Sequence, residues 1–226
     1  MKVLIIGNGR FDNIVKKIEY DLIICADGGF NKAIENGIYP DIVIGDFDSI
    51  VKGNDFSFDD IFHNIKVIEN DDQDSTDIEK ALIYCLDNKY LDVTVMGVTG
   101  LRNDHFLYNL YLLTYFFRKF SSLKIIDRLQ VITATDFRID FFEKMEYLSI
   151  FSLTRAMIGQ SSGLLYPINK MEIGYAGVQS QSNVVVKKDA FIEVESGEII
   201  VFFPLKYLNN FMIKKRNNYD IGKKVL

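Results

Sequence analysis

The stretch DLIICADGGFNKAIENGIYPDIVIGDFDSI, residues 21–50, decides the fold of this chain. Two short and nearly continuous apolar runs, at 21–26 and 41–45, are separated by a segment with a helical pattern. Such runs are typical of strands that are buried on both faces, whereas half-exposed strands alternate apolar and polar residues. The order strand, helix, strand predicts a βαβ unit of a parallel sheet.

The same alternation extends over the first half of the chain. Further strands are predicted at 2–7, 65–69, 91–98 and 123–127. The clearest helical patterns lie at 76–87 and 104–118. Residues 1–128 are therefore expected to form an α/β domain, in which helices cover both faces of a mostly parallel sheet.

The pattern changes after residue 128. Strand-like runs such as QVITAT (130–135) follow one another with short turns and no convincing helix, so 129–208 are expected to form an all-β sandwich or a partial barrel. The sequence GQSSG at 159–163 matches a nucleophile elbow, but no histidine follows position 105, and we interpret it as a polar loop. Residues 209–226 are expected to be a polar tail.

Composition excludes several classes of protein. The net charge of −5 argues against a general nucleic-acid binder. A hydrophobic content of 48% with 25% charged residues indicates a soluble globular protein. The two cysteines, Cys25 and Cys85, show no metal-binding spacing. The apolar start is too short for a signal peptide and the longest apolar run is too short to cross a bilayer, so we expect a cytoplasmic protein without a membrane partner.

Glycines and carboxylates gather where the predicted strands end. Along the chain these ends read GNGR (7–10), DGG (27–29), DFDS (46–49), DDQDSTD (71–77) and TGLRNDH (99–105). Ligands of open α/β sheets bind beyond the carboxyl ends of the strands, so these segments are expected to share one site. GNGR does not complete a dinucleotide fingerprint, because Asp12 takes the place of the third glycine, and no P-loop motif occurs.

Four of these carboxylates have the chemistry of a cation site. Asp46 and Asp48, two apart on an extended segment, point to the same side and need a cation, a proton or water between them. Asp74 and Asp77, three apart at a helix start, can face the same space. Oxygen ligands of this kind favour Mg²⁺ over Zn²⁺. The planar guanidinium of Arg102 suits phosphate oxygens.

Structural roles account for some of the same residues. Thr76 and Glu79 have the spacing of a capping box, and a carboxylate at Asp77 favours the dipole of the helix. Asp104 could be the N-cap of the next helix, and His105 could be a partly buried core residue. The residues alone leave these alternatives open.

Taken together, the motifs resemble the thiamine pyrophosphokinase (thiamin diphosphokinase) family. ADGGFNKA, PDIVIGDFDSI, DQDSTDIEKAL and GVTGLRNDH resemble its catalytic motifs in order, and GLLYPI followed by GVQSQSN is similar to its second domain. The resemblance spans residues 20–204. Leu101, where the family often has a glycine, and Asn103, where an apolar residue is usual, are departures that remove no charged group.

The resemblance implies a homodimer with sites between subunits, in which a pyrophosphoryl group passes from ATP to the hydroxyl of thiamine and AMP is released. Asp46, Asp48, Asp74 and Asp77 would bind Mg²⁺ and order the triphosphate, with Arg102 as a further catalytic residue. The residues implied in the nucleotide pocket are Asp27, Gly28, Gly29, Thr76, Arg102, Asp104 and His105, and those implied at thiamine are Tyr166, Ser180, Ser182 and Asn183.

Two other functions are alternatives at this point. One is another Mg²⁺-dependent phosphotransfer enzyme, such as a phosphatase with Asp46 as nucleophile; that class places its DxD motif after the first strand, whereas here it follows the third. The other is a non-catalytic nucleotide or thiamine sensor, which could lose several of the carboxylates that this chain keeps.

Overall fold

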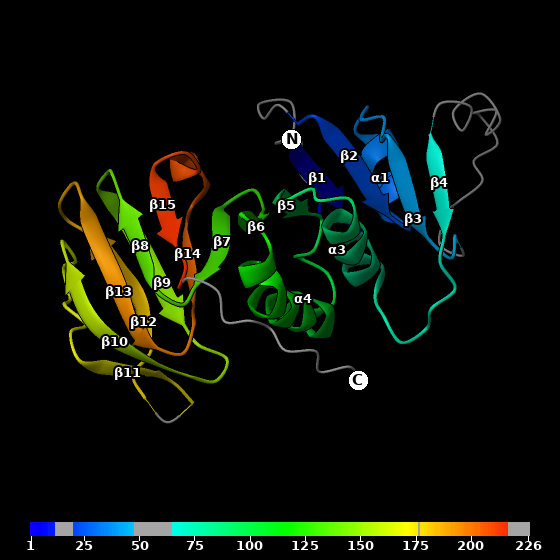
Figure 1. Ribbon diagram of the computed structural model, residues 1–226. Coiled ribbons are helices and arrows are strands. Elements are labelled where there is room, and N and C mark those ends of the chain that lie inside the picture. Colours follow the sequence, from blue (N-terminus) through cyan, green and yellow to red (C-terminus); the bar gives the residue numbers. More distant parts are fainter. Residues whose placement is uncertain (12–19, 48–64, 176, 217–226) are drawn as a thin grey trace. The chain divides into compact units, whose positions relative to one another are not determined.

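The structure is a computed structural model that describes residues 1–11, 20–47, 65–175 and 177–216. The chain divides into two compact units, Met1–Leu129 and Gln130–Leu226 (Figure 1). Asp48, one of the expected metal ligands, and Asp12 lie outside the described residues.

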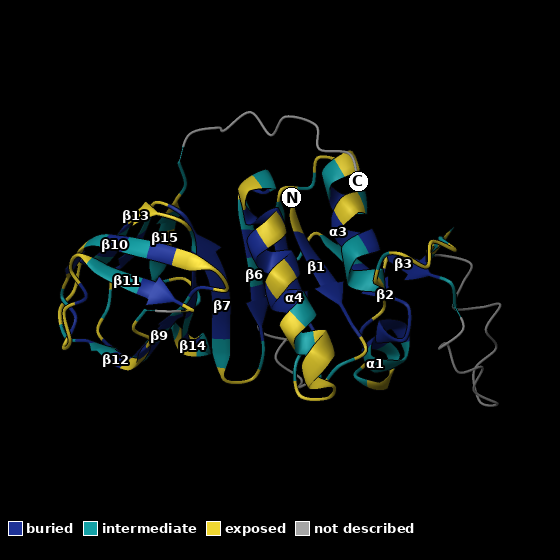
Figure 2. Ribbon diagram, turned by 90° about the horizontal axis from the view of Figure 1, so that it is seen from below, coloured by how far each residue is buried: buried dark blue, intermediate teal, exposed yellow. Residues whose placement is uncertain are grey.

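In its described residues the first unit contains six parallel strands. They are β1 (Lys2–Ile6), β2 (Leu22–Ala26), β3 (Ile42–Gly45), β4 (Lys66–Glu69), β5 (Asp92–Met96) and β6 (Ser122–Ile126), and their order across the sheet is β6-β5-β1-β2-β3-β4. The central strand β1 is fully buried from Val3 to Ile6, as expected for a strand covered on both faces (Figure 2). All six strands predicted from the apolar runs are confirmed.

Among the described residues, three α-helices accompany these strands: α1 (Gly29–Glu35), α3 (Asp77–Asp87) and α4 (Asn103–Phe116), the last followed by the short 3₁₀ helix η2 (Phe117–Lys119). Figure 1 shows α3 and α4 together on one face of the strands. The side chain of Thr76 caps α3, because its Oγ1 accepts a hydrogen bond from the backbone N–H of Glu79 over 3.4 Å. The predicted start of this helix is thereby confirmed.

The position of β1 in the sheet creates a crevice. The chain leaves β1 toward β2 on one side, whereas β5 pairs with β1 on the other side and continues toward β6. The strand order therefore reverses direction at β1 and β5. Ligands of open α/β folds bind at such a reversal of strand order.

The second unit is built from two antiparallel sheets. One has the order β12-β9-β14-β7 and the other has the order β11-β10-β13-β8-β15. The strands are β7 (Gln130–Thr135), β8 (Arg138–Phe141), β9 (Met145–Phe151), β10 (Arg155–Ser162), β11 (Met171–Gly174), β12 (Ser180–Val185), β13 (Ala190–Ser196), β14 (Ile199–Pro204) and β15 (Phe211–Lys214), with η3 (Leu205–Tyr207) before the last. The rings of Phe141 and Phe203 meet edge to face between the two sheets, with centroids 6.0 Å apart. The expected fold class, α/β followed by a β-sandwich, is confirmed.

Two local predictions are wrong. Phe211–Lys214, assigned to the polar tail, form β15, because the ring of Phe211 packs 4.8 Å from that of Phe203 and the strand pairs with β8. Residues 159–162 of the GQSSG motif belong to β10 instead of a loop, because their backbone pairs with β13. No helix among the described residues is long and apolar enough to cross a membrane.

Candidate active site

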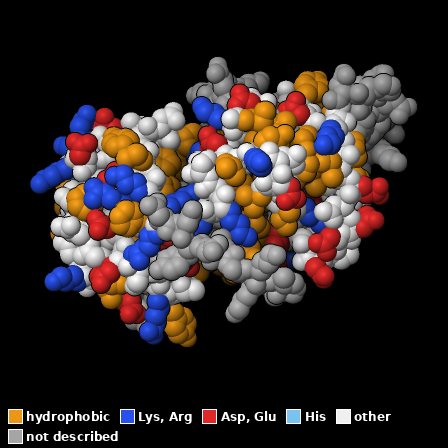
Figure 3. Space-filling view, viewed as in Figure 1, with side chains coloured by type: hydrophobic (Ala, Val, Ile, Leu, Met, Phe, Trp, Pro, Cys, Tyr) orange, Lys and Arg blue, Asp and Glu red, His pale blue; other side chains and the backbone are white. Residues whose placement is uncertain are grey.

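A cavity of about 700 Å³ opens in the first unit at the carboxyl ends of β1, β2 and β5. Its walls are the segments 7–9, 26–28, 73–78 and 97–99, together with residues between 101 and 109 at the start of α4. Four of the five segments that the sequence predicted at strand ends therefore contribute residues to one cavity. Around it, acidic side chains gather at the edge that carries β4 and the loop after it (Figure 3).

Backbone groups form much of the inner wall. The N–H of Gly9 donates to the carbonyl of Gly97 over 2.5 Å, and the N–H of Gly7 donates to Met96 over 2.8 Å. Gly28 lies against the side chain of Asn8, where an added Cβ would come within 2.5 Å of the amide nitrogen. Gly29 is not part of the wall; it allows α1 to pack directly on the carbonyl of Ile6. A close backbone wall leaves room for phosphate groups.

Asp27 is a buried carboxylate on this wall. Only 6% of the residue is exposed, and its Oδ1 atom has no hydrogen-bond partner among the residues that the structure describes. Its backbone has a φ of 40°, which is unusual for a residue with a side chain. A buried carboxylate oxygen without a partner is costly in a folded protein, which makes Asp27 a candidate for a functional role.

Asp77 lies on the same wall, half-buried in the first turn of α3. Burial raises the pKa of this carboxyl most; Lys80 opposes the shift, and the charges of Asp27 and Asp46 add to it. The Nζ atom of Lys80 is buried, donates to the carbonyl of Asn70 over 2.9 Å and lies 3.5 Å from Asp77 Oδ1. The charges of Asp27, Asp46 and Lys80 therefore all act on the carboxyl of Asp77.

Asp74 lines the cavity from an exposed loop. Its backbone N–H donates to Asp72 over 3.0 Å, and the N–H of Asp72 donates to Asn70 over 3.0 Å, so side chains of the loop fix its course. Within the described residues no three acidic, histidine or cysteine side chains lie close enough together to hold a metal ion. The expected cluster of four aspartates is therefore not assembled by the described residues, and Asp48 lies outside them.

Arg102 and Asp104 form an exposed bidentate pair at the entrance. The guanidinium holds the pKa of Asp104 at about 2. Arg102 occupies the N-cap position of α4 without capping through its side chain, so Asp104 is not the N-cap. His105 is exposed and lines the cavity, so it is not a core residue.

Sequence reasoning missed the second turn of α4. Tyr108 and Asn109 both line the cavity, and the phenol of Tyr108 donates to Glu79 Oε2 over 2.8 Å. This hydrogen bond raises the pKa of Tyr108 to about 12. The spacing of three and four residues from His105 was the available signal, because such residues share one helix face.

The four residues expected at the second substrate lie in the second unit. Asn183 is buried, and its amide donates to the carbonyl of Tyr166 over 2.7 Å and to Ser180 Oγ over 3.2 Å. Its Oδ1 accepts from the backbone of Tyr166 over 3.1 Å. Ser182 is exposed and its backbone N–H donates to Ser149. Asn183 thus fixes the backbone of Tyr166, whose side chain stays 64% exposed.

Known proteins resemble this chain over most of its length. Residues 11–126 match the family model of the thiamin pyrophosphokinase catalytic domain. The chain is 27% identical over 208 residues to Thiamin pyrophosphokinase 1 of Caenorhabditis elegans, covering 85% of this chain and 82% of that protein. It is 25% identical to Thiamine pyrophosphokinase of Bacillus subtilis, covering 89% of this chain and 98% of that protein.

Solved structures share the fold. The crystal structure of Thiamine pyrophosphokinase from Bacillus subtilis superposes with a TM-score of 0.79 at 23% identity, covering 90% of this chain and 99% of that one. Thiamin pyrophosphokinase from Candida albicans superposes with a TM-score of 0.75 at 19% identity, covering 90% and 88%. The similarity thus extends over both units.

Proposed function

The chain belongs to the thiamin pyrophosphokinase family, and on this premise we propose how its residues divide the work of the reaction. The enzyme transfers a pyrophosphoryl group from ATP to the hydroxyl of thiamine, which gives thiamine diphosphate and AMP. We assign ATP to the cavity of the first unit and thiamine recognition to the second, with 1–128 as catalytic domain and 129–208 as thiamine-binding domain.

One observation carries the assignment of the cavity: Asp27, a buried carboxylate whose Oδ1 has no hydrogen-bond partner among the described residues, lines the same cavity as Asp77 and Asp74. Hard oxygen donors of this kind fit Mg²⁺. We propose that Asp46, Asp48, Asp74 and Asp77 hold the ion and that Asp27 adds negative charge beside it. When bound, Mg²⁺ neutralises charge on the phosphate oxygens during transfer.

The phosphates of ATP are expected between the backbone wall and the first turns of α3 and α4. Helix N-termini and glycine-lined turns present N–H groups that suit anions. Arg102 is expected to exchange Asp104 for a phosphate, since an exposed ion pair contributes little and is easily broken. Thr76 and His105 complete this wall. One carboxylate of the site is expected to accept the hydroxyl proton of thiamine.

Tyr166 is proposed as the face that meets the cationic thiazolium ring of thiamine. Its exposed ring is free to lie against a cation, an attraction of about 1 kcal/mol or more once water is excluded. Asn183 and Ser180 are then positioning residues for Tyr166. Ser182 is an exposed member of the same set of four residues. We also propose that the protein is a homodimer and that it is cytoplasmic. A molecular mass of twice 26.0 kDa, measured by light scattering, would support the dimer.

The reaction is tested with purified protein, ATP, Mg²⁺ and thiamine. AMP and thiamine diphosphate should appear in equal amounts, and neither should form when thiamine or Mg²⁺ is left out. Release of inorganic phosphate without thiamine diphosphate would indicate a phosphatase. Binding of ATP without turnover would indicate a sensor, and either result would reject the proposal.

A further inference from the structure

Tyr108 is an aromatic residue on the wall of the cavity that the reaction does not yet explain. It lies on the second turn of α4, lines the cavity beside His105 and Asn109, and is partly exposed. Two contacts fix the orientation of its ring. The phenol donates to Glu79 Oε2 over 2.8 Å, and the ring stacks on Tyr111 with centroids 5.8 Å apart and planes inclined by 27°.

The stack continues along the helix. Tyr111 stacks in turn on Tyr115, with centroids 6.1 Å apart and planes inclined by 15°, and Lys119 Nζ lies 4.4 Å from the centre of the Tyr115 ring. Since Tyr111 covers one face of the Tyr108 ring, a ligand in the cavity would meet the other face. A ring whose orientation is fixed beforehand loses little conformational entropy when a flat ligand stacks on it.

Charge decides which part of a nucleotide fits beside this ring. The carboxylate of Glu79 lies within hydrogen-bonding distance of the phenol. This carboxylate repels phosphate, whereas the glycine-rich loops after β1 and β5 have backbone groups that suit it. A neutral, flat heterocycle is the part that suits the aromatic side.

We propose that Tyr108 is the surface on which the adenine base of ATP stacks, and that it thereby helps to set nucleotide affinity. This inference rests on the assignment of ATP to the cavity. A purely structural role, in which Tyr108 only ties α4 to α3 through Glu79, is the competing explanation. The two differ in what they demand of the ligand: stacking requires a base, whereas a structural tie affects every ligand of the cavity alike.

The test compares Tyr108→Leu, Tyr108→Phe and Tyr115→Leu with wild type. Tyr115→Leu is the matched control, because it makes the same change on the same helix at a residue that does not line the cavity. Calorimetry with Mg²⁺ measures binding of ATP and of inorganic tripolyphosphate to each protein. Tyr108→Leu should weaken ATP about tenfold and tripolyphosphate less than about twofold, as expected for loss of one base–aromatic stack. Tyr108→Phe and Tyr115→Leu should stay within about twofold of wild type for both ligands.

Steady-state kinetics provide a second test of the proposal. In Tyr108→Leu the KM for ATP should rise about tenfold, while kcat and the KM for thiamine stay within about twofold. Equal weakening of ATP and tripolyphosphate, unchanged ATP binding, or a rise confined to the KM for thiamine would each overturn the proposal. Failure of the proposed function would look different, since the wild-type protein itself would then form no thiamine diphosphate.

Discussion

Gly7 and Gly97 lie back to back at the base of the cavity. A Cβ atom on Gly7 would come within 2.7 Å of the carbonyl oxygen of Gly97, and a Cβ on Gly97 would collide with the carbonyl oxygen of Gly7. The loops after β1 and β5 therefore touch through their backbones. This contact closes the inner end of the crevice that the strand order creates.

Gly97→Ala should be strongly destabilising. Gly97 has a φ of 67°, and an added methyl group would also meet the backbone of Gly7, so we expect a loss of at least about 3 kcal/mol in urea unfolding. Gly37→Ala separates the two causes, because Gly37 has a φ of 69° but no atom near an added Cβ. That variant should lose only about 1 kcal/mol. Equal losses of unfolding free energy in the two variants would show that the contact between Gly97 and Gly7 is unimportant.

Asp77→Asn should lower kcat at least about a hundredfold, because charge stabilisation at the transferring phosphoryl group is removed. The same result is expected for Asp46→Asn. Thermal unfolding should remain close to that of wild type, since Asp77 is only half-buried. Asp71→Asn is the control: Asp71 is an exposed carboxylate of the same loop region that does not line the cavity. Near-normal turnover in Asp77→Asn with Mg²⁺ would show that the metal assignment is wrong.

Substitutions of Asn183 and of Tyr166 should affect the KM for thiamine through one shared contact. Tyr166→Leu is expected to raise the KM for thiamine about fivefold to tenfold, the equivalent of one cation–π contact. Asn183→Ala should raise it as well, because the backbone of Tyr166 loses two hydrogen bonds, one that its N–H donates to the amide oxygen of Asn183 and one that its carbonyl accepts from the amide nitrogen. The double variant should be no worse than the more affected single variant, since both changes remove the same contact.

The control for this pair is Tyr175→Leu, at a tyrosine that is 95% exposed in the same unit. It should leave the KM for thiamine within about twofold of wild type. Fully additive effects of the Asn183 and Tyr166 changes would contradict a positioning role for Asn183 and favour two independent contacts with thiamine.

Asp140→Asn tests a pH-dependent contribution to stability in the second unit. Burial would raise the pKa of Asp140, but hydrogen bonds from Arg138 and Lys214 outweigh it and hold the pKa below its usual value. A carboxyl with a lowered folded pKa stabilises the protein above its unfolded value of about 3.9, and this stability is lost as the pH falls through the folded pKa. Asp140→Asn should therefore cost about 2 kcal/mol at pH 7, and the difference from wild type should shrink below about pH 4.

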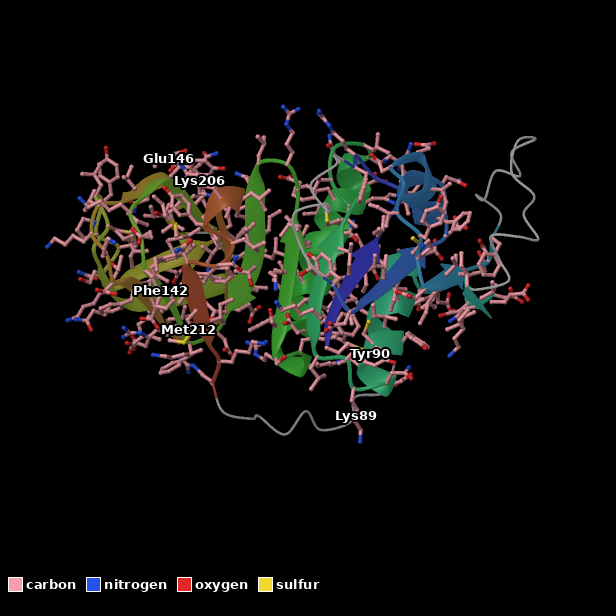
Figure 4. All side chains as sticks on the ribbon, turned by 90° about the horizontal axis from the view of Figure 1, so that it is seen from above. Lys89, Tyr90, Phe142, Glu146, Lys206 and Met212 are labelled. Carbon is pink, nitrogen blue, oxygen red and sulfur yellow. The ribbon has the colours of Figure 1, made fainter. Side chains whose placement is uncertain are left out.

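Urea unfolding at pH 7 and pH 3 measures this difference. Glu146→Gln serves as control, because Glu146 and Lys206 form an exposed pair 2.8 Å apart (Figure 4). Glu146→Gln should lower the free energy of unfolding by less than about 0.5 kcal/mol at pH 7. A cost of Asp140→Asn that is the same at both pH values would show that its charge is not what stabilises the sandwich.

Much of the fold could be predicted because its signals are local. Continuous apolar runs identified all six parallel strands, and the spacing of Thr76 and Glu79 located the start of α3. The short apolar segment at Phe211–Lys214 was missed, since flanking polar residues hide it until Phe211 meets Phe203 in the sandwich. Within the site, Tyr108 was missed because a tyrosine in a helix rich in Leu, Tyr and Phe resembles a core residue.

The sequence by itself determined the strands, the helix starts and the chemistry of the strand ends, because these depend on residues close together in the chain. Only the tertiary structure decided which ends meet. Strand order places β1 between β2 and β5, and the backbone contact of Gly7 with Gly97 then brings segments ninety residues apart to one wall. The tertiary structure also decided that Asp27 Oδ1 is buried with no hydrogen-bond partner among the described residues and that Asn183 holds the backbone of Tyr166, since burial and long-range hydrogen bonds exist only after the chain has packed.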